Sequence, residues 1–321
     1  DCTFQAEGTA NGNDLIPLYG SSGQGNQLIV DGLSMNTDSE NYLELIPAAK
    51  IGDQGFGTLE AAVEAADGDT IVILTDVAED ITIPKGKILP RALNGQTLTN
   101  VSSHTIVNQG TLTILDSAGG GVVDVVTHGK AALYNKGAIP EISGGTFTRS
   151  KEAGTTEGGN GNSWYTVYNA GTIEKITGGT FENSGTFSSM LVNGWNNPGP
   201  AVQGYIGTIS GGTFTGGSIT IKNDDGGKID KICGDAVITN ETQTAIQNTS
   251  TIGEISGGTI SGGGRAIYNS SWKDGAEEYI GTITIKDGAV IKGGINNTNW
   301  GGSSNTVTQF AKTTIEGGKI S

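Results

Sequence analysis

The densest group of acidic side chains is a cluster of aspartates, Asp224, Asp225 and Asp230, in the segment NDDGGKID. Paired carboxylates can act as general acid, general base or nucleophile in the cleavage of a glycosidic bond. The same oxygens could bind Ca²⁺, although no EF-hand or nonapeptide calcium pattern surrounds them. NDDGG is also an ordinary turn sequence. The cluster is therefore either a catalytic candidate or a turn.

Other catalytic chemistry has little support in the residue types. His104 and His128 are the only histidines, which is too few for a His-rich metal site and argues against a Ser-His-Asp triad. The glycine pairs follow strand-like segments and precede no helix, so they do not form a phosphate-binding loop. We expect no metal centre and no cofactor, with calcium left open at the aspartates.

These candidates are embedded in a repeated sequence. The phrase ISGGTF (142–147) returns as ITGGTF (176–181), ISGGTF (209–214) and ISGGTI (255–260), and each copy follows a phrase that contains an asparagine. Each unit holds three short strand-like pieces with glycines between them, and none has the longer apolar period of helical repeats. We therefore predict an all-β fold, a single-stranded parallel β-helix with three strands per coil.

Alignment of the repeats stacks one asparagine from each unit, with a mean spacing of about 27 residues per coil. A buried asparagine is unfavourable unless its amide is hydrogen-bonded, and stacked asparagines can bond to one another and to the turn backbone. The alternative is that these residues occupy exposed turns, where substitution would cost little. The predicted ladder comprises Asn108, Asn135, Asn169, Asn193, Asn223, Asn248, Asn269 and Asn296.

Aromatic residues form a second group of candidates, for ligand binding. All four tryptophans lie in segments of variable length between the repeated phrases, and two tyrosines are predicted to face outward from neighbouring coils. Aromatic rings on a surface can stack against sugars or a protein partner. The alternative is that each tryptophan holds its own loop against the coils. The candidates are Tyr134, Tyr168, Trp164, Trp195, Trp272 and Trp300.

The N-terminal part of the chain differs from the repeats. Residues 57–66 have apolar positions at helical spacing and Ala-rich composition, which predicts a short helix that caps the first coil. Residues 1–48 lack the repeat and are predicted to form an irregular extension or the remnant of a preceding domain. The β-helix is expected to occupy residues 49–321.

Composition excludes several kinds of partner. The net charge of −15 and the isoelectric point near 4.4 argue against nucleic acid, and no hydrophobic run approaches the length of a membrane span. Cys2 and Cys233 are too few for a disulfide scaffold, and we expect no bridge between them. We make no prediction of oligomeric state.

With the repeats aligned, a family resemblance is visible in AKIGDQGFGTLEAAVEAADGDTIVILTDV (49–77), LNGQTLTN (93–100), TIVNQGTLTILDSAGGG (105–121) and the units that follow. Residues 49–321 resemble the β-helical repeat regions of large secreted or cell-surface proteins of gut Firmicutes, within the pectate-lyase-like superfamily. The resemblance implies a right-handed parallel β-helix displayed outside the cell, as an adhesin or stalk. It implies no catalytic residues, and the three arginines offer no basic cleft of the kind a lyase needs.

Two classes of function follow from these observations. The first is a non-enzymatic extracellular or cell-surface module that acts as adhesin, stalk or binding surface for a glycan or for a host or bacterial surface protein. The alternative is a polysaccharide lyase or glycoside hydrolase, similar to a phage tailspike, with its carboxylate site on the exterior of the coils.

Overall fold

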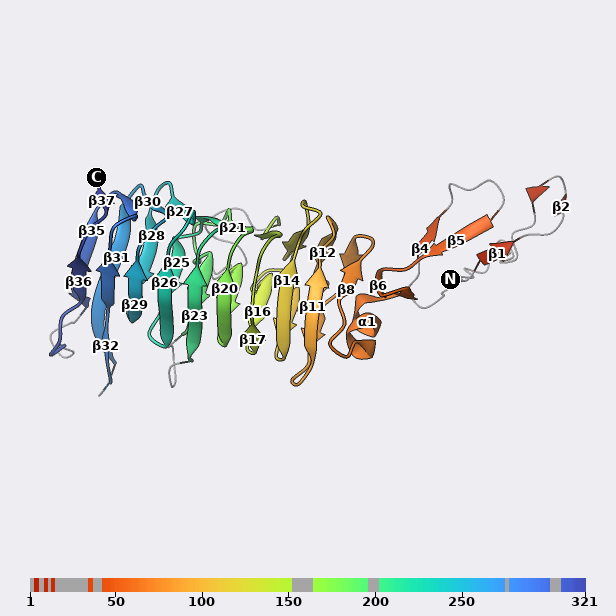
Figure 1. The fold of residues 1–321 in the computed structure, drawn as a ribbon, viewed down its shortest axis with the longest axis horizontal. Coiled ribbons are helices and arrows are strands. Elements are labelled where there is room, and N and C mark those ends of the chain that lie inside the picture. The colour runs from red at the N-terminus through yellow and green to blue at the C-terminus, as the bar shows by residue number, and fades with distance from the viewer. Residues whose placement is uncertain are drawn as a thin grey trace.

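The computed structural model describes residues 47–151, 164–195, 202–274, 277–300 and 307–321, apart from the side chains of Asp274 and Trp300, and five short strands before residue 47. In this part of the chain, three sheets, whose strands pair in parallel from one coil to the next, wind around one apolar interior (Figure 1). Each coil gives one strand to each sheet, except that one coil gives two strands, β31 (Arg265–Asp274) and β32 (Glu277–Ile280), to the same sheet. The fold is a parallel β-helix, as the repeats predict, and the described residues include one helix, as the composition of residues 57–66 predicts.

The three sheets are numbered in the order in which a coil passes through them. Sheet 1 contains β10 (Ile81–Ile83), β13 (Ile106–Asn108), β16 (Leu133–Asn135), β19 (Val167–Asn169), β22 (Leu191–Asn193), β25 (Ile219–Asn223), β28 (Thr244–Asn248), β31 (Arg265–Asp274), β32 (Glu277–Ile280) and β35 (Ile295–Trp300). Sheet 2 contains β6 (Ala49–Ile51), β7 (Gln54–Phe56), β8 (Ile71–Ile73), β11 (Ile88–Ala92), β14 (Thr111–Leu115), β17 (Ala138–Ile139), β20 (Thr172–Ile176), β23 (Gly204–Ile209), β26 (Gly227–Ile232), β29 (Thr251–Ile255), β33 (Thr282–Ile285) and β36 (Lys312–Ile315). Sheet 3 contains β9 (Val77–Ala78), β12 (Thr97–Thr99), β15 (Val122–Asp124), β18 (Thr146–Thr148), β21 (Thr180–Asn183), β24 (Thr213–Gly216), β27 (Val237–Asn240), β30 (Thr259–Gly262), β34 (Val290–Lys292) and β37 (Lys319–Ile320).

The strands before residue 47 pair antiparallel. β5 (Tyr42–Ile46) lies between β1 (Thr3–Gln5) and β4 (Ser34–Asn36), and β2 (Thr9–Ala10) pairs with β3 (Asn13–Asp14). These strands do not share the coil pattern of the β-helix, whose parallel pairing begins at β8, while β6 and β7 extend sheet 2 with antiparallel pairing.

The interior consists of columns of equivalent residues. Because the coils pair in parallel register, the same position of the repeat recurs at each strand spacing of about 4.8 Å. One of these columns is made of phenylalanine: Phe181 stacks between Phe147 and Phe214, with ring centroids 4.9 and 4.7 Å apart and ring planes within 4°. All three rings are fully buried.

The asparagine ladder is present and fully buried from Asn108 to Asn269. The side-chain Nδ2 of each rung donates to Oδ1 of the next at 2.7–2.9 Å, across spacings from 21 to 34 residues. The prediction of Asn296 as the last rung is wrong, because Asn269 pairs with Asn297. Ile295 aligns with the inward Ile267, so Asn296 falls opposite the outward Tyr268 and is exposed.

The capping helix α1 (Leu59–Ala65) lies beside the first coil, at the end of the rod (Figure 1). Thr58 is its N-cap residue, and the Glu79 carboxylate accepts hydrogen bonds from the first two backbone N–H groups of the helix, each at 3.0 Å. At the other end, Lys87 Nζ donates to the carbonyl of Glu64 in the helix at 2.8 Å and to that of the C-cap residue Ala66 at 2.7 Å. A carboxylate at the N-terminus and an ammonium at the C-terminus both complement the helix dipole.

Candidate functional site

Insertions interrupt the corner between sheets 1 and 2 at three places, and two of them flank the candidate site. One follows Asn193 in β22 and the other, which includes the hairpin of β31 and β32, follows Asn269. The two intervening coils turn directly after Asn223 and Asn248 into β26 and β29. The insertions therefore stand three strand spacings apart, roughly 14 Å, with two short turns between them.

A groove opens at these short turns and continues onto sheet 2. Its corner part has a volume of about 530 Å³ and includes Gln203, Asp225 and Ser250 in its lining. Its second part has a volume of about 680 Å³ and lies further along the same strands. The two parts share Thr172 and Tyr205, so we treat them as one feature, the sheet 2 groove.

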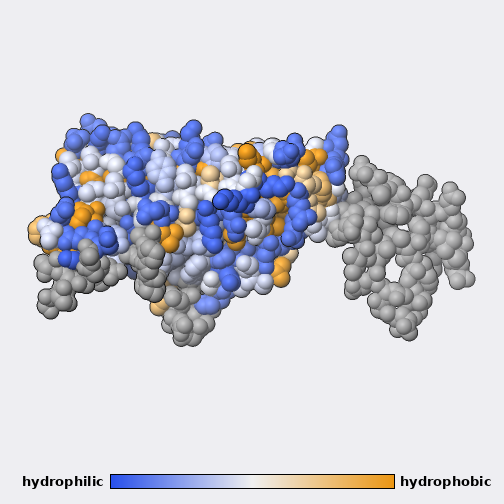
Figure 2. Space-filling view, turned by 90° about the horizontal axis from the view of Figure 1, so that it is seen from below, coloured by the Kyte–Doolittle hydropathy of each residue, from blue (hydrophilic) through white to orange (hydrophobic). Residues whose placement is uncertain are grey.

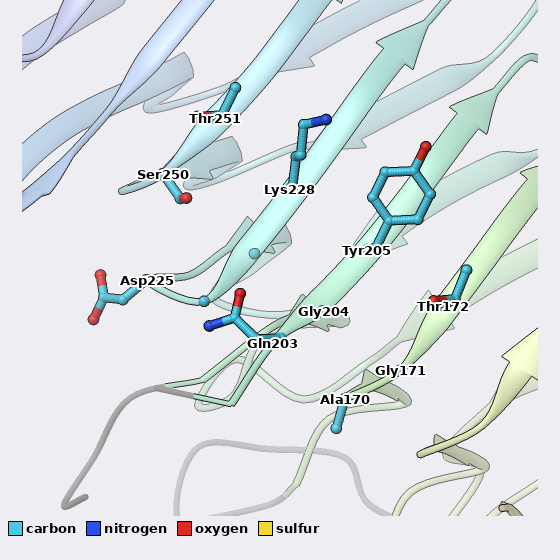
Figure 3. Close-up of a pocket in the computed structure, with 12 residues that line it drawn as sticks. Ala170, Gly171, Thr172, Gln203, Gly204, Tyr205, Asp225, Lys228, Ser250 and Thr251 are labelled. Atoms are coloured by element: carbon cyan, nitrogen blue, oxygen red, sulfur yellow. The ribbon is translucent and has the colours of Figure 1, made fainter. Parts of the chain in front are cut away.

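Four adjacent strands supply the central row of side chains in the groove. Thr172, Tyr205, Lys228 and Thr251 are register partners on β20, β23, β26 and β29, and they project side by side from the sheet (Figure 3). Strand alternation explains this row, because the neighbouring isoleucines on each strand point into the core. The row is a polar surface with one aromatic ring.

Polar contacts hold the Tyr205 ring in place. Its hydroxyl donates to Asp230 Oδ2 at 2.5 Å, and Lys228 Nζ lies 2.7 Å from Asp230 Oδ1 and 5.6 Å from the ring centroid. Hydrogen bonds from Lys228 and Tyr205 lower the pKa of Asp230, and the bond to Asp230 raises the pKa of Tyr205. Gly207 lies beside the ring and lines the same part of the groove. A side chain does not fit there, because a Cβ at this position would lie 2.5 Å from a backbone oxygen of the preceding coil.

Asp225 lies at the corner end of the groove and is 8% exposed. Trp272 Nε1, on the hairpin, donates to Asp225 Oδ1 at 2.5 Å. Burial raises the pKa of Asp225 to about 6, and the negative charge of Asp224 adds to the rise, against the hydrogen bond from Trp272. This carboxyl group therefore titrates close to neutral pH.

The structure separates the three predicted aspartates. Asp225 and Asp230 reach the two parts of the groove, whereas Asp224 does not line it. Asp224 is 5% exposed, forms an ion pair with Lys222 Nζ at 2.7 Å and accepts a hydrogen bond from Thr249 at 3.3 Å. The segment NDDGG therefore forms a turn, which was the alternative to a catalytic cluster. This turn nevertheless places the buried carboxyl group of Asp225 in the groove.

Three of the predicted aromatic candidates, Tyr134, Tyr168 and Trp164, pack together at sheet 1 and do not line the groove. Tyr134 and Tyr168 stack on neighbouring coils, with centroids 4.7 Å apart, and Trp164 packs edge-on against both at 5.9 and 5.5 Å. Tyr168 is only 5% exposed. These contacts are those expected of rings that hold a loop to the rod, and a role in ligand binding stays a prediction.

The remaining tryptophans also contact their surroundings. Trp195 packs against Tyr165 at 5.7 Å, and Lys222 Nζ lies 5.3 Å from its ring centroid. Trp272 stacks on Tyr279 within the hairpin at 5.4 Å. The side chain of Trp300 lies outside the described residues.

Tyr205, the central side chain of the groove, was not among the sequence candidates. The available signal was a substitution within the repeat: GYIGTI (204–209) has tyrosine where the aligned strands have Thr172 and Thr251. A mixed-charge column borders the far end of the groove. There Glu254 forms ion pairs with Lys231 at 2.6 Å and Lys286 at 2.7 Å, and hydrogen bonds from both lower its pKa to about 2.

Hydrophilic residues predominate on the face of the rod shown in Figure 2, with hydrophobic residues in small groups between them. In the described part of the chain, no cluster of three or more His, Cys, Asp or Glu residues is placed to hold a metal ion, and no helix there is long and apolar enough to cross a membrane. Cys233 is a free thiol, and Cys2 lies outside the described residues.

Comparison of the chain with protein-family models, curated proteins and solved structures gives no match in any of the three. A functional inference therefore rests on the groove and on the residues that line it.

Proposed function

We propose that this chain is a non-enzymatic, extracellular or cell-surface β-helix module that binds a glycan in the sheet 2 groove. The observation that carries the proposal is the groove itself, with an oriented aromatic ring among hydroxyl, amide, carboxyl and ammonium groups. A sugar offers an apolar C–H face that can stack on Tyr205 and hydroxyls that can bond to the surrounding groups.

The β-helix suits an adhesin or stalk because its ladder and stacked core hold the groove on rigid strands rather than loops. The location outside the cell rests on the resemblance of residues 49–321 to surface-protein repeats and is part of the proposal. Labelling of intact cells with an antibody against the chain tests it. Signal that appears only after the cells are permeabilised would contradict a surface location.

A glycan array followed by calorimetry on the best ligands tests the binding proposal. We expect Tyr205→Ala to weaken binding at least about tenfold, since it removes the stacking ring. Tyr268→Ala is the matched control, because this tyrosine is an outward residue of sheet 1. Failure of every glycan to bind, or equal binding by Tyr205→Ala and the unmodified chain, would refute the proposal.

Cleavage of a glycan in the same groove is the second candidate. The observation that favours it is the opposite shift of two carboxyl pKa values, since the pKa of Asp225 is raised and that of Asp230 is lowered. Such a pair can supply a general acid and an ionised partner. A reducing-end assay on a bound glycan tests this second candidate. If the chain releases reducing ends, and Asp225→Asn still binds the glycan but no longer releases them, the protein is a hydrolase or lyase and not a non-enzymatic binding module.

A further inference from the structure

Arg91 occupies an inward position of β11 and is fully buried. Its register partners are Ile71 on β8 and Ile114 on β14. The same column continues with isoleucine in the following coils, at Ile142, Ile176, Ile209, Ile232, Ile255 and Ile285. The sequence thus places a cationic side chain where the neighbouring coils have an aliphatic one.

None of the three guanidinium nitrogens of Arg91 has a hydrogen-bond partner among the described residues. The other fully buried arginine differs, because Arg149 Nη1 donates to the carbonyls of Lys130 and Tyr165. A buried charge without a counter-charge and hydrogen bonds is strongly unfavourable. Arg91 therefore requires a partner that the protein groups around it do not supply.

Burial lowers the pKa of Arg91 to about 10, and the negative charge of Glu79 acts in the opposite direction and raises it. At neutral pH the guanidinium is therefore still protonated. Both Glu79 oxygens, however, accept backbone N–H groups of α1. Glu79 supplies a favourable field at Arg91 but no hydrogen bond.

We propose that the Arg91 guanidinium binds a small inorganic anion of the chloride type in the interior of the first coils. An anion supplies both the hydrogen-bond acceptor and the negative charge, whereas water would supply only the acceptor. A monatomic ion suits this position better than phosphate or sulfate, because the register partners Ile71 and Ile114 are apolar and could not satisfy further oxygens. The site lies near the end of the rod that α1 closes, so the ion stabilises the capped end.

Thermal unfolding tests the proposal. Chloride is varied at constant ionic strength by exchange with gluconate, which is too large for the interior. We expect the Tm of the unmodified chain to rise by about 2–4 °C for each tenfold increase in chloride above its dissociation constant. Arg91→Met keeps the length of the side chain without its charge, and its Tm should not depend on chloride. An identical chloride response in both proteins would overturn the proposal.

Diffraction from crystals of the full chain grown in bromide gives a second measurement that needs no variant. We expect an anomalous peak within hydrogen-bonding distance of the Arg91 nitrogens. Water at that position, or a direct contact between Arg91 and a carboxylate, would overturn the proposal even if Arg91→Met does not fold.

Discussion

The central rung Asn169 offers the sharpest test of how the fold is held together. Its Nδ2 donates to Asn193 Oδ1 at 2.7 Å and to the carbonyl of Tyr205 at 3.0 Å, and its Oδ1 accepts from Asn135 Nδ2 at 2.8 Å. Asn169→Ala removes these three bonds and a longer fourth one, from the backbone N–H of Gly171 to Asn169 Oδ1 at 3.4 Å, and leaves polar atoms of the neighbouring rungs buried. At about 1 kcal/mol for each net bond, we expect a loss of about 2–4 kcal/mol in the free energy of unfolding.

Equilibrium unfolding in urea measures this loss, as a shift of the midpoint at an unchanged m-value. The end of the ladder supplies two controls. Asn297→Ala removes an exposed rung and should cost about 1 kcal/mol or less, and Asn296→Ala, next to it but outside the ladder, should cost close to nothing. If Asn169→Ala costs no more than Asn296→Ala, the asparagines are ordinary turn residues and the ladder does not stabilise the fold.

Three further substitutions have defined outcomes. The pKa of Asp225 is about 6 in the folded state and about 3.9 in the unfolded state, so ionisation of Asp225 destabilises the fold as the pH rises through this window. We expect Asp225→Asn to remove this pH dependence. In urea titrations at pH 7, the substitution should raise the free energy of unfolding by about 1–3 kcal/mol. Lys87→Ala should cost about 1 kcal/mol and speed hydrogen exchange in α1, whereas Lys85→Ala, on an exposed turn nearby, should change neither. Phe181→Ala opens a cavity between two stacked rings and should lower the free energy of unfolding by about 3–5 kcal/mol.

The scaffold could be predicted from the sequence because its residues repeat in phase. Stacked positions such as Phe147 and Phe181 meet at every coil, so a pattern visible in one dimension becomes a column in three. The prediction of the ladder was wrong only at its last rung, where the adjacent residues Asn296 and Asn297 fit the repeat equally well. In the structure Ile295 aligns with Ile267, so Asn297 is the residue that joins the ladder. The error is one of register, which the sequence of a single coil does not determine.

The candidate site was harder to predict, since it depends on departures from the repeat. Tyr205 was missed because one tyrosine aligned with two threonines and a lysine is a single substitution without a motif. Asp225 was included in the aspartate cluster, but the sequence could not separate it from Asp224. Their opposite environments follow from the turn, which directs one carboxyl group to Lys222 and the other to Trp272.

The uneven length of the coils links the scaffold to the groove. Successive rungs are 21 to 34 residues apart, yet their hydrogen bonds stay within 2.7–2.9 Å, because strand pairing sets the distance between coils whatever the chain does between strands. Insertions are therefore tolerated at the corner without loss of register. Two long coils with two short ones between them leave a recess, and the groove begins there, at Asp225 and Gln203. In this β-helix the short turns are as important to the site as the insertions that flank them.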